Sequence, residues 1–199
     1  MTTTNLSPDD NLESRWPKDS DRLFQELAWA NDAHIARNPA ERFYRLPMGY
    51  KRAGDILLDH ATFDAIDRSN IIYAALFCYR QAIELFLKQI IDEFSSDKIY
   101  KPKYTHELSI LWERYISIAK ERRTEDSMGV SAVQKLVMEM HNADQFSDGF
   151  RFPTDKSSSP FTFGDQSIDL ANLREVMAGL TNFFECAYLD FSNRDDMSP

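Results

Sequence analysis

The chain has 199 residues, of which 43% are apolar and 13% aromatic, and its formal net charge at pH 7 is −9. This length and apolar content suit one compact domain with a substantial core, and they exclude a wholly disordered chain. The acidic charge argues against broad electrostatic binding to nucleic acid or anionic lipid, because both require a surplus of Lys and Arg.

The chain begins with a polar segment and a first predicted helix. Residues 1–18 are polar and acidic, which predicts a flexible tail. A helix is predicted over 19–36, because Asp19 and Ser20 are both good N-caps and apolar residues follow at helical spacing. The Arg-Asn-Pro sequence at 37–39 is expected to end this helix.

The middle of the chain predicts three helices. The first covers 49–60, and the second covers 69–94, where apolar residues form a broad band with no Gly or Pro inside. At a rise of 1.5 Å per residue the helix over 69–94 would be about 40 Å long, the central helix of the domain. The third is expected to start at Thr105 as its N-cap, with Glu107 in its first turn and apolar positions continuing to Ala119.

Two helices are predicted in the last third of the chain. Ser131 and Gln134 match a capping box, and the helix that they begin should end near Asp144. Residues 145–166 read as irregular, and a last helix is predicted over 168–191. Four phenylalanines could clamp the irregular segment onto the core or pair as a short hairpin: Phe150, Phe152, Phe161 and Phe163.

These elements predict an all-α fold, a helical bundle of about six helices with a long central helix and an irregular loop before the last helix. One domain is expected over 19–191, between flexible tails at 1–18 and 192–199.

The sequence also indicates where the protein works. Its first ten residues lack the basic start and apolar run of a secretion signal, and no segment approaches roughly 18 uninterrupted apolar residues. Cys78 and Cys186 both lie in apolar helical patterns and read as small buried side chains rather than a disulfide. We expect a cytoplasmic protein with no membrane partner.

Three charged residues, Arg80, Glu84 and Lys88, stand four residues apart and so form one stripe on a helix. One interpretation is a solvated ladder of ion pairs worth a few tenths of a kcal/mol each. The other is that Arg80 and Glu84 face a neighbouring helix and organise a polar pocket, in which the fork of the guanidinium would clamp a phosphate.

His106 is the histidine with the strongest case for chemistry. In the first turn of its predicted helix it would feel the positive end of the helix dipole, which favours a neutral imidazole able to accept a proton. The alternative is that one ring nitrogen ties the linker to a neighbouring carbonyl. His141 is interpreted as a core or rim histidine whose hydrogen bonds are satisfied.

Arg151 lies between Phe150 and Phe152. Alternation would place the two rings on one side and the guanidinium on the other, where it could stack on a base or hold a phosphate. A loop pinned by its aromatic residues explains the same pattern.

Metal and cofactor motifs are not found. The sequence has no Glu-x-x-His pairs of the kind that bind two irons in helical bundles, and no Cys or His cluster with zinc spacing. It also lacks a Gly-rich phosphate loop and a Gly-x-Ser-x-Gly elbow. We therefore expect no metal and no cofactor.

Several of these segments, taken in order, resemble the bacterial HEPN-like family (higher eukaryotes and prokaryotes nucleotide-binding). The resemblance rests on Tyr-Arg-Gln-Ala-Ile-Glu-Leu-Phe-Leu-Lys at 79–88, His-Glu-Leu at 106–108 and Phe-Arg-Phe-Pro-Thr-Asp at 150–155, and it covers about 67–191.

The resemblance implies a small helical bundle, often dimeric, associated with bacterial defence, toxin–antitoxin pairs or nucleotidyltransferase partners. Family members that cut RNA carry an Arg followed, after four to six residues, by a His. This chain lacks that motif: in the nearest pair, Arg52 and His60, seven residues intervene. The resemblance therefore suggests a site at Arg80, Glu84 and His106, with Arg151 as an addition, that binds RNA or a nucleotide without strong catalysis.

Two alternatives remain open. The first is a metal-independent ribonuclease of unusual motif, in which His106 acts as base and Arg80 stabilises the phosphate. The second is a non-enzymatic protein that forms a homodimer or masks a toxin as its antitoxin.

Overall fold

The computed structural model describes residues 16–24, 33, 35–97, 105–155, 157–161 and 167–196. The chain divides into two compact units, Met1–Ile35 and Ala36–Pro199. In the first unit, Lys18 and Asp21 form a turn in which the Lys18 amide donates to the Asp21 carboxylate over 2.8 Å.

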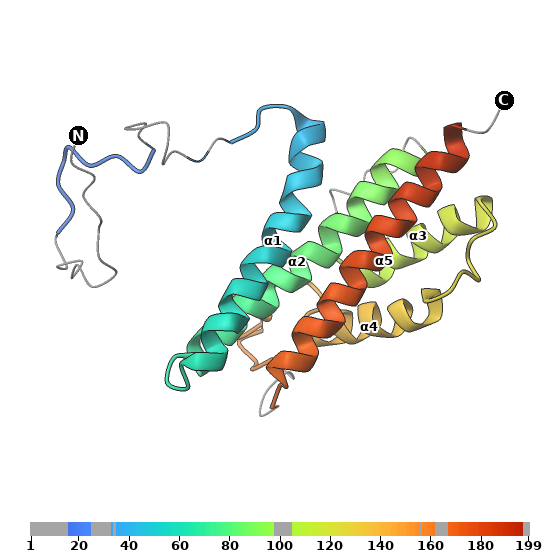
Figure 1. The fold of residues 1–199 in the computed structure, drawn as a ribbon. Coiled ribbons are helices and arrows are strands. Elements are labelled where there is room, and N and C mark those ends of the chain that lie inside the picture. The colour runs from blue at the N-terminus through green and yellow to red at the C-terminus, as the bar shows by residue number, and fades with distance from the viewer. Residues whose placement is uncertain are drawn as a thin grey trace. The chain divides into compact units, whose positions relative to one another are not determined.

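The second unit is all-α, as predicted. Its described part contains five helices and one isolated β-bridge, between Thr154 and Pro160. The helices are α1 (Pro39–Phe63), α2 (Arg68–Phe94), α3 (Leu108–Glu121), α4 (Val130–Ala143) and α5 (Leu170–Asp196). In Figure 1, α1 lies on one side of α2, while α3 and α4 lie on the other. No helix among the described residues is long and apolar enough to cross a membrane.

Helix α1 begins ten residues before the predicted start at residue 49, and the reason lies in Asn38 and Pro39. The Asn38 side chain accepts a hydrogen bond from the Ala40 amide over 2.9 Å, and Pro39 occupies the first turn, where its missing N–H costs nothing. The pair predicted to end a helix therefore starts one. Of the first predicted helix, residues 19–24, 33, 35 and 36 are not helical, and residues 25–32 and 34 lie outside the described residues.

Close packing joins α1 to α2. Gly54 lies against the ring of Tyr79, so closely that a Cβ at position 54 would be 2.5 Å from Tyr79 Cε1. The Tyr79 hydroxyl donates to the buried carboxylate of Asp55 over 2.9 Å, and Lys51 donates to the other oxygen over 2.7 Å. Burial, together with the bond to Asp55, raises the pKa of Tyr79. The absence of a side chain at Gly54 thus lets the two helices approach.

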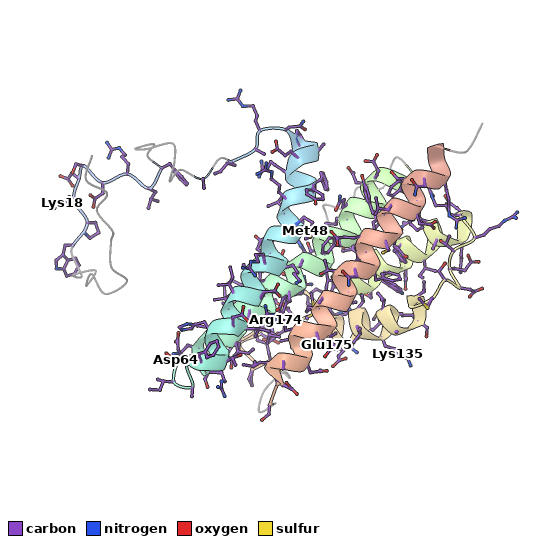
Figure 2. The ribbon with its side chains drawn as sticks, viewed as in Figure 1. Lys18, Met48, Asp64, Lys135, Arg174 and Glu175 are labelled. Carbon is purple, nitrogen blue, oxygen red and sulfur yellow. The ribbon has the colours of Figure 1, made fainter. Side chains whose placement is uncertain are left out.

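The core forms where α2 meets α3 and α5, and Figure 2 shows the side chains that fill this space. Phe86 of α2 stacks on Phe184 of α5 with ring centroids 5.6 Å apart. Phe94 packs edge-on against Tyr188, with centroids 5.1 Å apart. Helix α2 begins at Arg68, one residue before its predicted start, and ends at Phe94 as predicted.

The starts of α3 and α4 differ from the predicted starts. Helix α3 starts at Leu108 with Glu107 as its cap, so Thr105 is not the N-cap. The predicted capping box of α4 is wrong, because Gly129, with φ of 93°, precedes Val130 and no side chain caps the helix. The end of α4 at Ala143 agrees with the prediction.

Helix α5 starts at Leu170 and continues to Asp196, five residues past the predicted end at 191. The side chain of Asp169 accepts from the amides of Ala171 and Asn172, over 3.0 and 3.1 Å, and so caps its start. Cys186 on this helix is exposed and Cys78 on α2 is half-buried, so the prediction of two buried cysteines is wrong; neither forms a disulfide.

The loop before α5 is only partly clamped by its phenylalanines. Phe150 is buried and Phe161 half-buried, but Phe152 is exposed. Phe163 lies outside the described residues. The bridge between Thr154 and Pro160 is the short pairing that this segment forms.

Candidate functional site

A buried cluster of charges joins α2 to two other segments of the chain. Arg80 donates through Nη1 to Glu84 over 2.7 Å, through Nε to the backbone oxygen of Asp144 over 3.0 Å, and through Nη2 to the backbone oxygen of His106 over 2.6 Å. Its side chain is 0% exposed. One guanidinium therefore holds together α2, the residues before α3 and the end of α4.

Glu84 is the centre of this cluster. Its Oε2 accepts from Arg80, and its Oε1 accepts from Lys88 Nζ over 2.8 Å and lies 2.9 Å from Nδ1 of His106. Burial alone would raise the pKa of Glu84, but the hydrogen bonds and charges of Lys88 and Arg80 outweigh burial and hold this pKa below its ordinary value. Glu84 is therefore ionised at neutral pH.

The interpretation of Arg80, Glu84 and Lys88 as a solvated ladder is wrong, because all three are buried. A phosphate clamp at Arg80 does not fit this arrangement either. The guanidinium is enclosed, and each of its three nitrogens already donates to a group of the chain. Its effect is to position Glu84 and the backbone at His106.

His106 is the member of the cluster that reaches solvent, with 59% of its side chain exposed. It lies two residues before the start of α3, so the prediction that placed it in the first helical turn is wrong. An ionised carboxylate can only accept, so Nδ1 carries the hydrogen that faces Glu84. In the neutral ring Nε2 is then the acceptor, able to take a proton or a hydrogen bond from a ligand.

Arg151 lies on the surface, away from the hydrogen bonds of the cluster. Its guanidinium lies 5.6 Å from the ring centroid of Phe77 and 5.3 Å from that of Phe152, and its Nε donates to the Ser147 backbone oxygen over 2.6 Å. The expected alternation is wrong, because Phe150 is buried whereas Phe152 is exposed beside Arg151. The guanidinium thus lies within cation–π distance of two aromatic rings on an accessible surface.

Arg151 and His106 are related through the same helix. Arg151 packs on Phe77, and His106 contacts Glu84 seven residues later on α2. Seven residues span about 10 Å of helix. Between Phe77 and Glu84 on α2, the side-chain amide of Gln81 donates to Ser147 Oγ over 2.7 Å. This hydrogen bond holds the loop that carries Arg151 to α2.

Asp144 is a member of this region that was not predicted to contact Arg80. Asp144 lies 3.3 Å from Arg80 Nε through Oδ2, while its Oδ1 accepts from the amides of Asp148 and Gly149. No sequence pattern links Asp144 to an arginine 64 residues away. Asp144 fixes the turn that leads from α4 toward Arg151.

His141 is buried near the cluster, and the prediction that its hydrogen bonds are satisfied fails at one atom. Its Nδ1 is buried with no hydrogen-bond partner in the described part of the chain. Burial lowers the pKa of His141; the negative charge of Glu107 opposes this change, and the positive charge of Arg80 adds to it. His141 is therefore held neutral.

Within the described ranges, no group of three or more His, Cys, Asp or Glu side chains could hold a metal ion. Comparison with protein-family models, curated protein sequences and solved structures finds no match to this chain.

Proposed function

We propose that this chain is a HEPN-like helical bundle of the cytoplasm that binds a phosphate-bearing ligand, RNA or a nucleotide, on the α2 surface between His106 and Arg151. The observation that carries this proposal is an exposed imidazole whose Nδ1 is held by the buried carboxylate of Glu84. An imidazole fixed in this way presents Nε2 to a ligand with little loss of side-chain entropy.

The second support is Arg151. Arg151 is exposed and its guanidinium lies within cation–π distance of two aromatic rings, where its N–H groups could bind a phosphate. The two α2 residues that support His106 and Arg151 are about 10 Å apart along the helix. Arg80 and Glu84 are buried beneath this surface and position His106.

Equilibrium titration tests the proposal. A short fluorescent single-stranded RNA and adenosine monophosphate are titrated separately into the full chain at rising salt. We expect His106→Ala and Arg151→Met each to weaken binding by about tenfold, and we expect salt to weaken RNA binding further. Arg45→Met, a change at an exposed arginine of α1, is the control and should have no effect. Binding that neither His106→Ala nor Arg151→Met weakens would refute the proposal.

A metal-independent ribonuclease is the second candidate, and the Glu84–His106 contact favours it because a carboxylate-oriented histidine suits general-base chemistry. His106 Nε2 would take the proton of a ribose 2′-hydroxyl, whose oxygen then attacks the adjacent phosphorus. The bond from phosphorus to the 5′-oxygen of the next nucleotide breaks, that oxygen takes up a proton from the imidazolium or from water, and a 2′,3′-cyclic phosphate remains. Arg80 is enclosed, so the phosphate would depend on a different cation. Cleavage of RNA in excess EDTA that His106→Ala abolishes would support this candidate, and its absence would remove it.

We further propose that the chain is an accessory module in toxin–antitoxin or defence systems. It would act as a homodimer or in a complex with an antitoxin or a nucleotidyltransferase. Phe63 and Ile66, 90% and 91% exposed, support a protein-binding surface near the end of α1. Light scattering after size exclusion measures the mass. A monomer at every concentration would contradict the homodimer.

A further inference from the structure

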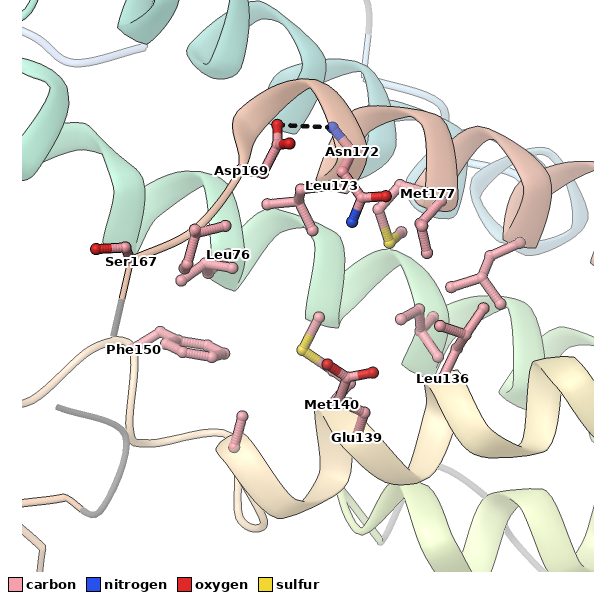
Figure 3. A pocket seen from close by; sticks show the side chains of 15 residues that line it. Leu76, Leu136, Glu139, Met140, Phe150, Ser167, Asp169, Asn172, Leu173 and Met177 are labelled. Carbon is pink, nitrogen blue, oxygen red and sulfur yellow. Dashed lines mark hydrogen bonds between the residues drawn. The ribbon is translucent and has the colours of Figure 1, made fainter. Parts of the chain in front are cut away.

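A cavity of about 290 Å³ lies between α2, α4 and α5, and Figure 3 shows the residues around it. Its walls are mainly apolar, with Leu76 and Ile83 from α2, Met140 from α4 and Met177 from α5. The ring of Phe150 points into the space. A volume near 300 Å³ is at the lower end of the range for small-molecule sites, which suits one flat ring system.

Polar groups stand at the rim of this cavity. Glu139 of α4 is exposed there, and Asp169 and Asn172 stand at the start of α5. The Oδ1 atom of Asp169 already accepts two backbone amides of α5. Glu139, whose carboxylate accepts none of the hydrogen bonds found in the described part of the chain, is the acceptor that we assign to an occupant. A carboxylate at an apolar opening favours a ring with N–H donors on its edge and disfavours an anion.

The cavity is adjacent to the surface of Arg151. Leu76 and Phe150 line the cavity, and the next residues in the chain, Phe77 and Arg151, are in contact on the surface. Consecutive Cα atoms are about 3.8 Å apart. The backbone segments that form part of the cavity wall thus also carry the Arg151 surface, and we infer that one nucleotide can span the two. In Figure 3, Phe150 belongs to the loop that follows α4, whereas Glu139 belongs to α4 itself.

We propose that this cavity holds an amino-bearing nucleobase, with Glu139 accepting from its exocyclic amine, Phe150 and Met140 against its faces, and the phosphate at Arg151. The inference rests on the proposed function and adds the position and chemical class of the base. Methionine sulfur and an aromatic ring are both favourable neighbours for a flat heterocycle. A base without the amine could not make the hydrogen bond to Glu139. The amine therefore determines which base binds more tightly.

The test uses nucleotide pairs that differ in this group. Guanosine monophosphate is compared with inosine monophosphate, which lacks the 2-amino group, and cytidine with uridine monophosphate. We expect the amino-bearing member of at least one pair to bind about tenfold more tightly to the full chain. Glu139→Gln should remove most of that difference, whereas Glu175→Gln, at an exposed glutamate of α5 outside this cavity, should preserve it. Equal affinity within both pairs would overturn the inference.

A second set of ligands separates this inference from the proposed function. Leu173→Trp would fill the cavity, and its helical circular dichroism shows whether the variant folds. We expect it to abolish the advantage of a nucleotide over ribose 5-phosphate. If ribose 5-phosphate binds as well as every nucleotide and remains sensitive to Arg151→Met, the cavity inference fails and the phosphate site stands. If nucleosides bind in a way that Glu139→Gln weakens, but phosphate adds nothing, the phosphate site fails and the cavity inference stands.

Discussion

The Oε1 atom of Glu84 lies 2.9 Å from Nδ1 of His106, although the two residues are 22 positions apart and the carboxylate is buried whereas the imidazole is exposed. Arg80 and Lys88 compensate the charge of Glu84 beneath the surface. A buried ion cluster thus holds a histidine that faces solvent.

Replacement of Arg80 tests the structural role of the cluster. Arg80→Met leaves buried Asp144 without its cation and removes one of the two cations that pair with buried Glu84. We expect a loss of about 3–5 kcal/mol in the free energy of unfolding, measured by urea denaturation. Arg45→Met removes an exposed arginine paired with Glu41 and should change stability by less than about 1 kcal/mol. Equal effects of the two substitutions would contradict the enclosed cluster.

The cluster also predicts how stability responds to acid. The pKa of Glu84 is lower in the folded chain than its ordinary value of 4.5, so its stabilising contribution is complete above pH 4.5 and is lost as pH falls through the folded pKa. Glu84→Gln should therefore flatten the acid limb of the curve of stability against pH. A variant with the same acid limb as the unchanged protein would show that Glu84 is not held ionised by its neighbours.

A histidine gives a second pH dependence, at a higher pH. Burial lowers the pKa of His141 below 6.5, so protonation favours the unfolded chain. The contribution of neutral His141 is complete above pH 6.5 and declines as pH falls through its lower folded pKa. We expect stability to fall between neutral pH and pH 5. His141→Gln should reduce that fall more than His60→Gln, the matched change at an exposed histidine. A fall in stability that His141→Gln leaves unchanged would contradict the lowered pKa of His141.

The approach of α1 to α2 predicts opposite effects at two glycines of one helix. At Gly54 an added Cβ would be 2.5 Å from the Tyr79 ring, whereas at Gly49 no atom lies within 4 Å. Gly54→Ala should lower the free energy of unfolding by about 1–3 kcal/mol, because a buried ring must move. Gly49→Ala should raise it by about 0.5–1 kcal/mol, because alanine favours the helix. Thermal and urea unfolding of both variants give the comparison, and stabilisation by Gly54→Ala would be inconsistent with the close contact.

The start of α1 supplies a test of helix capping. Asn38→Ala removes the side chain that accepts from the Ala40 amide, and we expect it to cost about 1 kcal/mol. Ser131→Ala is the matched change, since Ser131 lies inside α4 and makes no cap hydrogen bond. Its effect should stay within about 0.5 kcal/mol. A larger loss from Ser131→Ala than from Asn38→Ala would favour the capping box that the sequence suggested.

Helix α2 could be predicted from the sequence to within one residue because its apolar band is long and uninterrupted, and each periodic position supports the same register. The start of α1 could not, because Asn-Pro is compatible with both the end of one helix and the beginning of another. Local spacing does not distinguish these cases, and only the hydrogen bond to Ala40 decides between them.

The candidate site, too, could be predicted from the sequence only in part. Helical spacing brings Arg80 and Glu84 to one stripe, but the sequence leaves open whether that stripe is solvated or faces a neighbouring helix; in the structure it is buried. Whether a stripe is buried depends on what covers it, and here Arg80 is covered by the end of α4, including Asp144. That contact joins positions 64 residues apart, and no periodicity in a single segment reports it.

Two adjacent faces of α2 make different contacts. Leu76 and Ile83 line the cavity, whereas Glu84 contacts His106. These residues belong to one continuous helix, so any molecule that displaces α2 when it fills the cavity must also displace the carboxylate beneath the imidazole. Occupancy at the two places would then be thermodynamically linked, and the linkage would be equal in both directions. An occupant of the cavity would change the affinity at His106 by the same factor by which a ligand at His106 changes the affinity of the cavity.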